Sequence, residues 1–163
     1  MSRVELLPQP LDKTTFACYG DVIETAGGES FSINQGYAER FHDLAAIDVT
    51  TGGGRPTLSI FHARPRPLPI EIGFMERHPL GSQAFMPLEP APFLVLVARE
   101  PEIESLQLFL SNGRQGVNYH RGVWHYPLLV LNKESDFLVI DRSGADCNFE
   151  ERRLNRSAWI AHG

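Results

Sequence analysis

Turn-forming residues interrupt this chain about every eight to twelve residues, and that spacing limits what it can fold into. The sequence has 14 glycines and 12 prolines among its 163 residues. The segments between them are short and rich in Val, Ile, Leu and Phe, so they predict about ten β-strands with little helix. The pattern favours an all-β sandwich or closed barrel over a layered α/β fold.

The most apolar segment, residues 93–98, predicts a strand buried on both faces. A short helix is expected from Asp12, a good N-cap residue, to Gly20. Residues 101–110 fit either a helix or a strand, and Pro101 favours a helical turn. Other strands are expected at residues 4–7, 21–25, 31–34, 57–63, 70–76, 128–131 and 137–141.

Two further segments are expected to be less regular. The three glycines at 52–54 predict a flexible loop. The residues from 148 onward are predicted to form a polar tail that packs on the surface or on a partner.

Composition is that of a soluble globular protein, with 42% hydrophobic and 21% charged residues. The formal net charge of −5 argues against a nucleic-acid partner, which needs a basic patch. No apolar run reaches the ~20 residues of a membrane helix, and no signal pattern is seen. We therefore expect one cytoplasmic domain over residues 1–163, with Cys18 and Cys147 as free thiols in a reducing compartment.

The stretch from Glu76 to Leu88 combines an acid, a cation, an imidazole and an amide. Glu76 and His78 are two apart, so in an extended strand they point to the same face. The turn residues at 79–81 follow, and Gln83 begins the next strand. Acid, imidazole and amide are thus expected at one pocket mouth.

A second polar stretch, residues 117–127, contains His120 and His125. In a straight strand these two would face opposite ways, but a turn at Arg121 and Gly122 could direct both to one cavity. Imidazole is the commonest metal ligand and a general acid or base near neutral pH. We predict that the two polar stretches face each other. The alternative for any single ring is a hydrogen bond to the backbone.

Other polar residues carry weaker signals. Arg40 and His42 share one face of an expected strand, which is either solvated or a pocket wall where Arg40 suits a carboxylate. His62 is expected to be a packed or surface histidine, and His162 to be exposed. The chain has no Gly-rich phosphate loop, Gly-x-Ser-x-Gly elbow or Cys-x-x-Cys pair.

The spacing of the two stretches resembles the cupin motifs, His-x-His-x4-Glu and Pro-x-Gly-x2-His. Glu76-x-His78-x4-Gln83 has the spacing of the first, and His120-x-Gly122-x2-His125 that of the second. His78 and His125 match the metal-binding histidines of cupins. Glu76 stands where a histidine is usual, and Gln83 where a glutamate is usual.

The chain also resembles the ureidoglycolate lyase family over about residues 4–150. The resemblance implies a single cupin-type β-barrel or jelly roll that forms a homodimer. It further implies conversion of (S)-ureidoglycolate to glyoxylate and urea in allantoin and purine catabolism, helped by a divalent metal, with Ni²⁺ among those used. The segments that carry it are Tyr19–Ile23, Ile33–Asn34, Glu39–Leu44, Glu76–Phe85, Gly116–His120, Trp124–Leu128 and Phe137–Arg142.

In this interpretation Glu76, His78 and His125 form the reacting centre, either as metal ligands or as direct acid and base. The mixed oxygen and nitrogen set suits Ni²⁺, Zn²⁺ or Mn²⁺, and no organic cofactor is expected. The substrate would be held by two further groups: Asn34, Gln83 and His120 at its urea, and Arg40 or Arg121 at its carboxylate. The alternatives are a non-catalytic cupin that binds a small acid and another cupin enzyme, such as a sugar epimerase or a dioxygenase.

Overall fold

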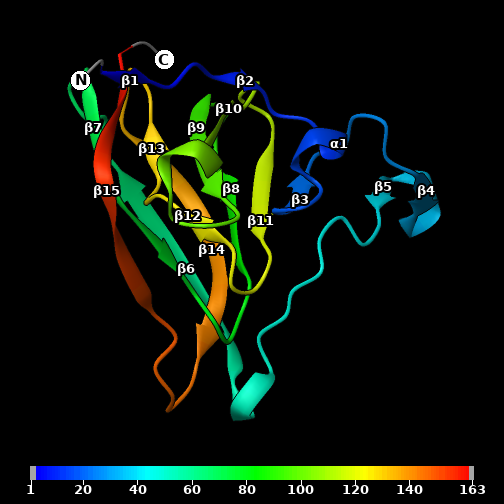
Figure 1. The fold of residues 1–163 in the computed structure, drawn as a ribbon. Coiled ribbons are helices and arrows are strands. Elements are labelled where there is room, and N and C mark those ends of the chain that lie inside the picture. Colours follow the sequence, from blue (N-terminus) through cyan, green and yellow to red (C-terminus); the bar gives the residue numbers. More distant parts are fainter. Residues whose placement is uncertain (1–2, 162–163) are drawn as a thin grey trace.

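The computed structural model describes residues 3–161, and β-strands dominate it (Figure 1). Two sheets face each other and enclose the core, which confirms the all-β barrel expected from the sequence. No helix among residues 3–161 is both long and apolar enough to cross a membrane. His162 lies outside the described residues.

An eight-stranded sheet forms one wall of the barrel. β9 is buried along its whole length, as its apolar sequence predicts, and it lies in the interior of this sheet. The order is β1 (Val4–Glu5), β15 (Glu150–Ile160), β7 (Ile70–Arg77), β12 (Trp124–His125), β9 (Phe93–Ala98), β10 (Gln107–Leu110) and β2 (Gln9–Pro10), with β13 (Leu129–Val130) also paired to β9.

A five-stranded sheet forms the opposite wall. Its order is β3 (Gly20–Ile23), β11 (Gly116–Tyr119), β8 (Gln83–Pro87), β14 (Ser135–Ser143) and β6 (Arg55–Ala63). Side chains alternate along β14, so that Phe137 and Val139 enter the core while Leu138 and Ile140 face outward. The core between the walls contains Val95 and Val97 of β9 packed with these inward side chains.

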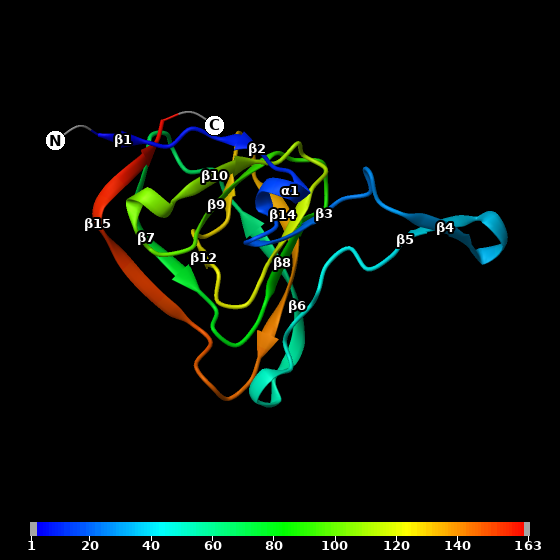
Figure 2. The same ribbon diagram turned by 45° about the vertical axis from the view of Figure 1, so that its right-hand side comes forward.

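The remaining elements lie outside the barrel walls. Helix α1 (Lys13–Phe16) begins at Asp12, whose carboxylate accepts hydrogen bonds from the amides of Thr14 and Thr15 at 2.8 and 2.9 Å. The short 3-10 helices η2 (Thr51–Gly53) and η3 (Ile103–Ser105) lie in connections. A two-stranded hairpin, β4 (Ser30–Ile33) and β5 (Ala38–Phe41) joined by η1 (Asn34–Gly36), projects to one side (Figures 1 and 2).

Three sequence-based expectations need correction. The first helix ends at Phe16, and Gly20 opens β3 instead of ending the helix. Glycine is needed there for the close approach of β11, because a Cβ would lie 2.0 Å from the Asn118 carbonyl oxygen. Residues 101–110, for which helix and strand were both open, contain the favoured helical turn only as the short 3-10 helix η3, and strand β10 follows it. The expected polar tail is β15, an 11-residue strand that pairs with β7 and β1.

Candidate active site

Three polar side chains meet between the walls at the ends of β7 and β12. Glu76 is paired directly with His125 across these two strands, and His78 follows the end of β7. One ligand atom from each of the three lies within 4.8 Å of the others. The Nε2 atom of His125 is 3.5 Å from Oε1 of Glu76. The structure therefore brings together Glu76 and His78 of the first polar stretch with His125 of the second.

Backbone carbonyls fix the tautomers of both imidazoles. Nδ1 of His78 lies 2.8 Å from the Asn148 carbonyl oxygen, and Nδ1 of His125 lies 3.0 Å from that of Val123. A carbonyl only accepts hydrogen bonds, so each Nδ1 carries the proton. In the neutral form of either ring, the lone pair is then on Nε2. Both Nε2 atoms are buried and make no hydrogen bond within residues 3–161.

Burial and neighbouring charges control the protonation of His78 and Tyr119. Burial lowers the pKa of His78, and the nearby His125 lowers it further, so the His78 ring is neutral at neutral pH. The Tyr119 ring stacks on His125 with centroids 4.3 Å apart and an interplanar angle of 9°. Burial, together with the negative charge of Glu76, raises the pKa of the Tyr119 hydroxyl, which stays protonated.

Gln83, on the facing wall, presents a free acceptor. Its Nε2 donates to Oδ2 of Asp141 at 3.3 Å, which fixes the orientation of the amide. Its Oε1 is buried and has no hydrogen-bond partner within the described residues. Tyr119 and Asp141 were missed in the sequence, where both read as ordinary strand residues. Only their inward register, next to Gln83 and His125, could have indicated them.

The donor set of the three grouped side chains fits a divalent metal. Two imidazole nitrogens without a proton and one carboxylate are common ligands of Zn²⁺, Ni²⁺ and Mn²⁺. The backbone carbonyls that hold each Nδ1–H are the outer partners typical of metal-binding histidines. The buried, unpartnered Nε2 atoms are what such an ion would satisfy.

The other predicted site residues lie elsewhere. Asn34 and Arg40 are on the projecting hairpin. His120 places Nε2 3.3 Å from Asp21 Oδ1. Arg121 lies 3.5 Å from Asp48 and donates to the Thr51 hydroxyl at 2.7 Å. Among residues 3–161, none of these four side chains has a hydrogen bond or ion pair with the triad.

A strap, residues 44–54, crosses the outside of the five-stranded sheet next to the site. The Ser82 amide donates to the Asp48 carbonyl at 2.8 Å, and the Asp48 amide donates to the Ser82 hydroxyl at 2.8 Å. The Arg142 guanidinium donates from Nε and Nη2 to the Thr51 carbonyl at 2.9 and 2.7 Å. These contacts fix the strap against the residue that precedes Gln83.

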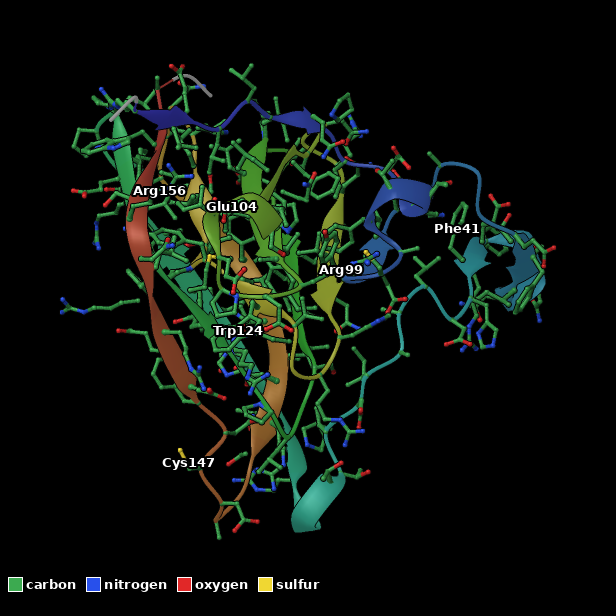
Figure 3. The ribbon with its side chains drawn as sticks, in the orientation of Figure 1. Phe41, Arg99, Glu104, Trp124, Cys147 and Arg156 are labelled. Carbon is green, nitrogen blue, oxygen red and sulfur yellow. The ribbon has the colours of Figure 1, made fainter. Side chains whose placement is uncertain are left out.

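Both cysteines are free, as expected, and both are exposed. Figure 3 shows Cys147 near the loop that follows β14, at the opposite end of the molecule from the chain termini. The adjacent Asn148 supplies the carbonyl that holds His78, and its side-chain oxygen accepts from the Leu80 amide at 2.7 Å. The loop therefore positions the first polar stretch.

Comparison with known proteins connects this site to one family. Residues 3–161 match the family described as ureidoglycolate lyase. The chain is 53% identical over 159 residues to the "Ureidoglycolate lyase" of Pseudomonas syringae pv. syringae (strain B728a), covering 96% of this chain and 94% of the relative. It is 49% identical over 154 residues to the protein of that name from Burkholderia mallei (strain NCTC 10229), covering 93% and 91%.

Among solved structures, a 3,4-ketoisomerase from Helicobacter canadensis matches with a TM-score of 0.42 and 12% identity. The match covers 77% of this chain and 84% of that structure. A likeness this distant has no bearing on the chemistry of the site.

Proposed function

The chain belongs to the ureidoglycolate lyase family, and we propose that it cleaves (S)-ureidoglycolate to glyoxylate and urea at the Glu76, His78 and His125 site. The observation that carries the proposal is the pair of buried imidazoles whose Nε2 lone pairs face a carboxylate. Such a group can take up a proton inside a barrel and return it. We place this site in a single domain over residues 1–163 and in allantoin and purine catabolism.

The reaction requires one proton to move between two atoms of the substrate. The base takes the proton of the hydroxyl on the central carbon, whose oxygen then forms the carbonyl of glyoxylate. The carbon–nitrogen bond breaks, and its electron pair goes to the leaving nitrogen. That nitrogen takes a proton, and urea departs. One residue can serve as base and then as acid.

His125 is suited to move this proton. Its Nδ1–H is held by the Val123 carbonyl, so Nε2 is the atom that accepts. Glu76, 3.5 Å from that nitrogen, would stabilise the imidazolium formed in the process. His78 provides a second Nε2 that is neutral because burial lowers its pKa.

The alternative to direct proton transfer by His125 is that Glu76, His78 and His125 would together hold one divalent metal, with Ni²⁺ first by family resemblance and Zn²⁺ or Mn²⁺ as alternatives. In that case the Nε2 lone pairs of both imidazoles would be ligands, and neither ring would be the base. When bound, such an ion supplies Lewis acidity that lowers the pKa of a hydroxyl. The unpartnered Oε1 of Gln83 would accept hydrogen bonds from the urea group. His120 and Asn34 are proposed to orient the same group, and either Arg40 or Arg121 is proposed to neutralise the substrate carboxylate. No organic cofactor is required.

We further propose that the protein is cytoplasmic and works as a homodimer, with no nucleic-acid or membrane partner. The formal net charge of −5 supports the exclusion of nucleic acid. The homodimer rests on the family resemblance and on the exposed surfaces described below.

The test of the proposed function is the product balance from (S)-ureidoglycolate. A lyase releases glyoxylate and urea in equal amounts and no ammonia, and it consumes no oxygen. Ammonia release would indicate hydrolysis of the ureido group, and oxygen uptake would indicate a dioxygenase. Saturable binding of ureidoglycolate without turnover would support the non-catalytic alternative.

A further inference from the structure

The projecting hairpin makes its contacts with itself. We call residues 29–42 the arm. β4 and β5 pair with each other from Ser30 opposite Phe41 to Ile33 opposite Ala38. The Ser30 hydroxyl bonds to Glu39 within the arm, and Phe31 packs on His42 with ring centroids 6.0 Å apart. Both views show the arm apart from the barrel, and Figure 3 places Phe41 well away from Trp124 (Figures 1 to 3).

The arm also exposes large apolar side chains. Tyr37 is 91% exposed and Phe31 is 49% exposed. An isolated two-stranded hairpin is at best marginally stable in water, and it usually needs a third strand or a packed face. The arm therefore lacks the cover that such a hairpin requires.

A second apolar surface lies uncovered on the barrel. We call the outward side chains of Leu58, Ile60, Met86, Leu138 and Ile140 the outer face. They are contiguous across the five-stranded sheet, because Leu58 pairs with Ile140 and Ile60 with Leu138, which in turn pairs with Met86. Leu58 is 67% exposed and Ile60 is 52% exposed. Contiguous apolar surface of this kind on a soluble protein marks an interaction site.

Building on the proposed function, we infer that the arm of one copy packs on the outer face of a second copy and brings Arg40 to that copy's active site. A second copy is the occupant because each chain presents both surfaces, and its own arm points away from its own barrel. Two copies related by a two-fold axis then bury both surfaces twice. The arm and the outer face together approach the 20–30 residues a side that a stable interface uses.

The pairing of the other arginines near the site indicates the role of Arg40. The substrate carries a carboxylate, but the arginines that border the site are committed. Arg77 lies 2.6 Å from Glu150, Arg121 is paired with Asp48, and Arg142 is bound to the Thr51 carbonyl. Arg40 makes no side-chain hydrogen bond or ion pair within residues 3–161, and it is exposed on the arm. A cation from the partner copy completes the anion site.

The first test measures assembly without reference to turnover. The wild-type protein should have the mass of a dimer in light scattering at micromolar concentration. Tyr37→Ser combined with Phe31→Ser should shift it to the monomer, and so should Leu58→Asp. Leu7→Ser is the matched control, because Leu7 is 74% exposed on the N-terminal segment. A monomeric wild type, or a dimer unchanged in the arm and outer-face variants, overturns the docking.

The second test measures whether Arg40 acts at the active site of its own copy or at that of the partner copy. Arg40→Ala should lower kcat/KM about 10- to 100-fold, the loss expected for one charge-assisted contact, and Arg40→Lys should lose less. Glu76→Gln should be inactive. Dimers that contain one Arg40→Ala chain and one Glu76→Gln chain, purified through two different tags, should regain about half of the wild-type rate, because one of their two sites is intact.

Mixed dimers as inactive as their parents overturn delivery to the partner. If the wild type itself releases no glyoxylate, the proposed function fails, and the masses in the first test still decide whether the arm docks.

Discussion

Replacing Arg142 tests how the strap is held beside the site. Arg142 is 8% exposed, and its guanidinium donates to the Thr51 carbonyl from two nitrogens at 2.9 and 2.7 Å. Three glycines leave room for it: a Cβ on Gly54, Gly81 or Gly144 would lie 2.2, 2.8 or 2.8 Å from an Arg142 atom. Hydrogen bonds to a charged group contribute about 1.5–3 kcal/mol each. Losing two of them predicts that Arg142→Ala costs about 3–6 kcal/mol of the free energy of unfolding.

Urea unfolding followed by fluorescence measures this cost as a shift of the midpoint at constant slope. Arg114→Ala is the matched control, since the Arg114 side chain is exposed and makes no hydrogen bond within residues 3–161. The control should change the free energy of unfolding by less than about 0.5 kcal/mol. If Arg142→Ala stays within that same range, Arg142 does not hold the strap. In that case, a lower kcat in Arg142→Ala could not be explained by a strap that has come loose next to Ser82 and Gln83.

Four further outcomes follow from the structure. Gly81→Ala should cost about 1–3 kcal/mol in urea unfolding, because the new Cβ would lie 2.8 Å from Arg142 Cβ; an unchanged midpoint would contradict the close packing. Burial lowers the pKa of His78 below that of a free imidazole, so its contribution to stability is present above pH 6.5 and is lost as pH falls through the folded pKa. His78→Asn should therefore flatten the dependence of the free energy of unfolding on pH below pH 6.5, as measured by urea unfolding at several pH values. His62 shows the opposite sign, because the hydrogen bonds that its ring donates to Asp136 and Glu134 raise its pKa. Its small contribution to stability is present below pH 6.5 and is lost as pH rises through the raised pKa, so His62→Asn should remove a weak decline in stability near neutral pH. In titration calorimetry, Glu76→Gln should bind Ni²⁺ at least about tenfold more weakly than wild type, and equal affinity would remove Glu76 from the ligand set.

Local sequence signals were sufficient for much of the barrel. The apolar run of β9 and the alternation along β14 identify buried strands directly, and both are found. The prediction of a polar tail from residue 148 onward was wrong for a physical reason. β15 buries only a few residues such as Ala158 and Ile160, and its register shifts between Arg153 and Ala158, so no regular period-two pattern appears. Its pairing with β7 is a long-range property that the segment itself does not encode.

The site was predictable where spacing alone determined it. Glu76 and His78 share a face by strand geometry, and the structure brings both to His125 across the β7 and β12 pair. The glycines at 52–54 predicted a flexible loop, but the strap is fastened there by Arg142, whose sequence position gives no sign of this contact. The position of Arg40 on an arm outside the barrel was equally hidden, since a hairpin reads the same whether or not it packs on its own chain.

The rate of glyoxylate and urea release by His78→Asn and His125→Asn, compared with wild type, tests the central claim most directly. His62→Asn serves as the control, because His62 is held by Asp136 and Glu134 at a distant strand edge. We expect each site variant to lose about 10²–10⁴ in kcat while the control keeps the wild-type rate, since each site imidazole acts in the chemical step. Near wild-type turnover in both site variants would show that the reaction takes place elsewhere in the protein.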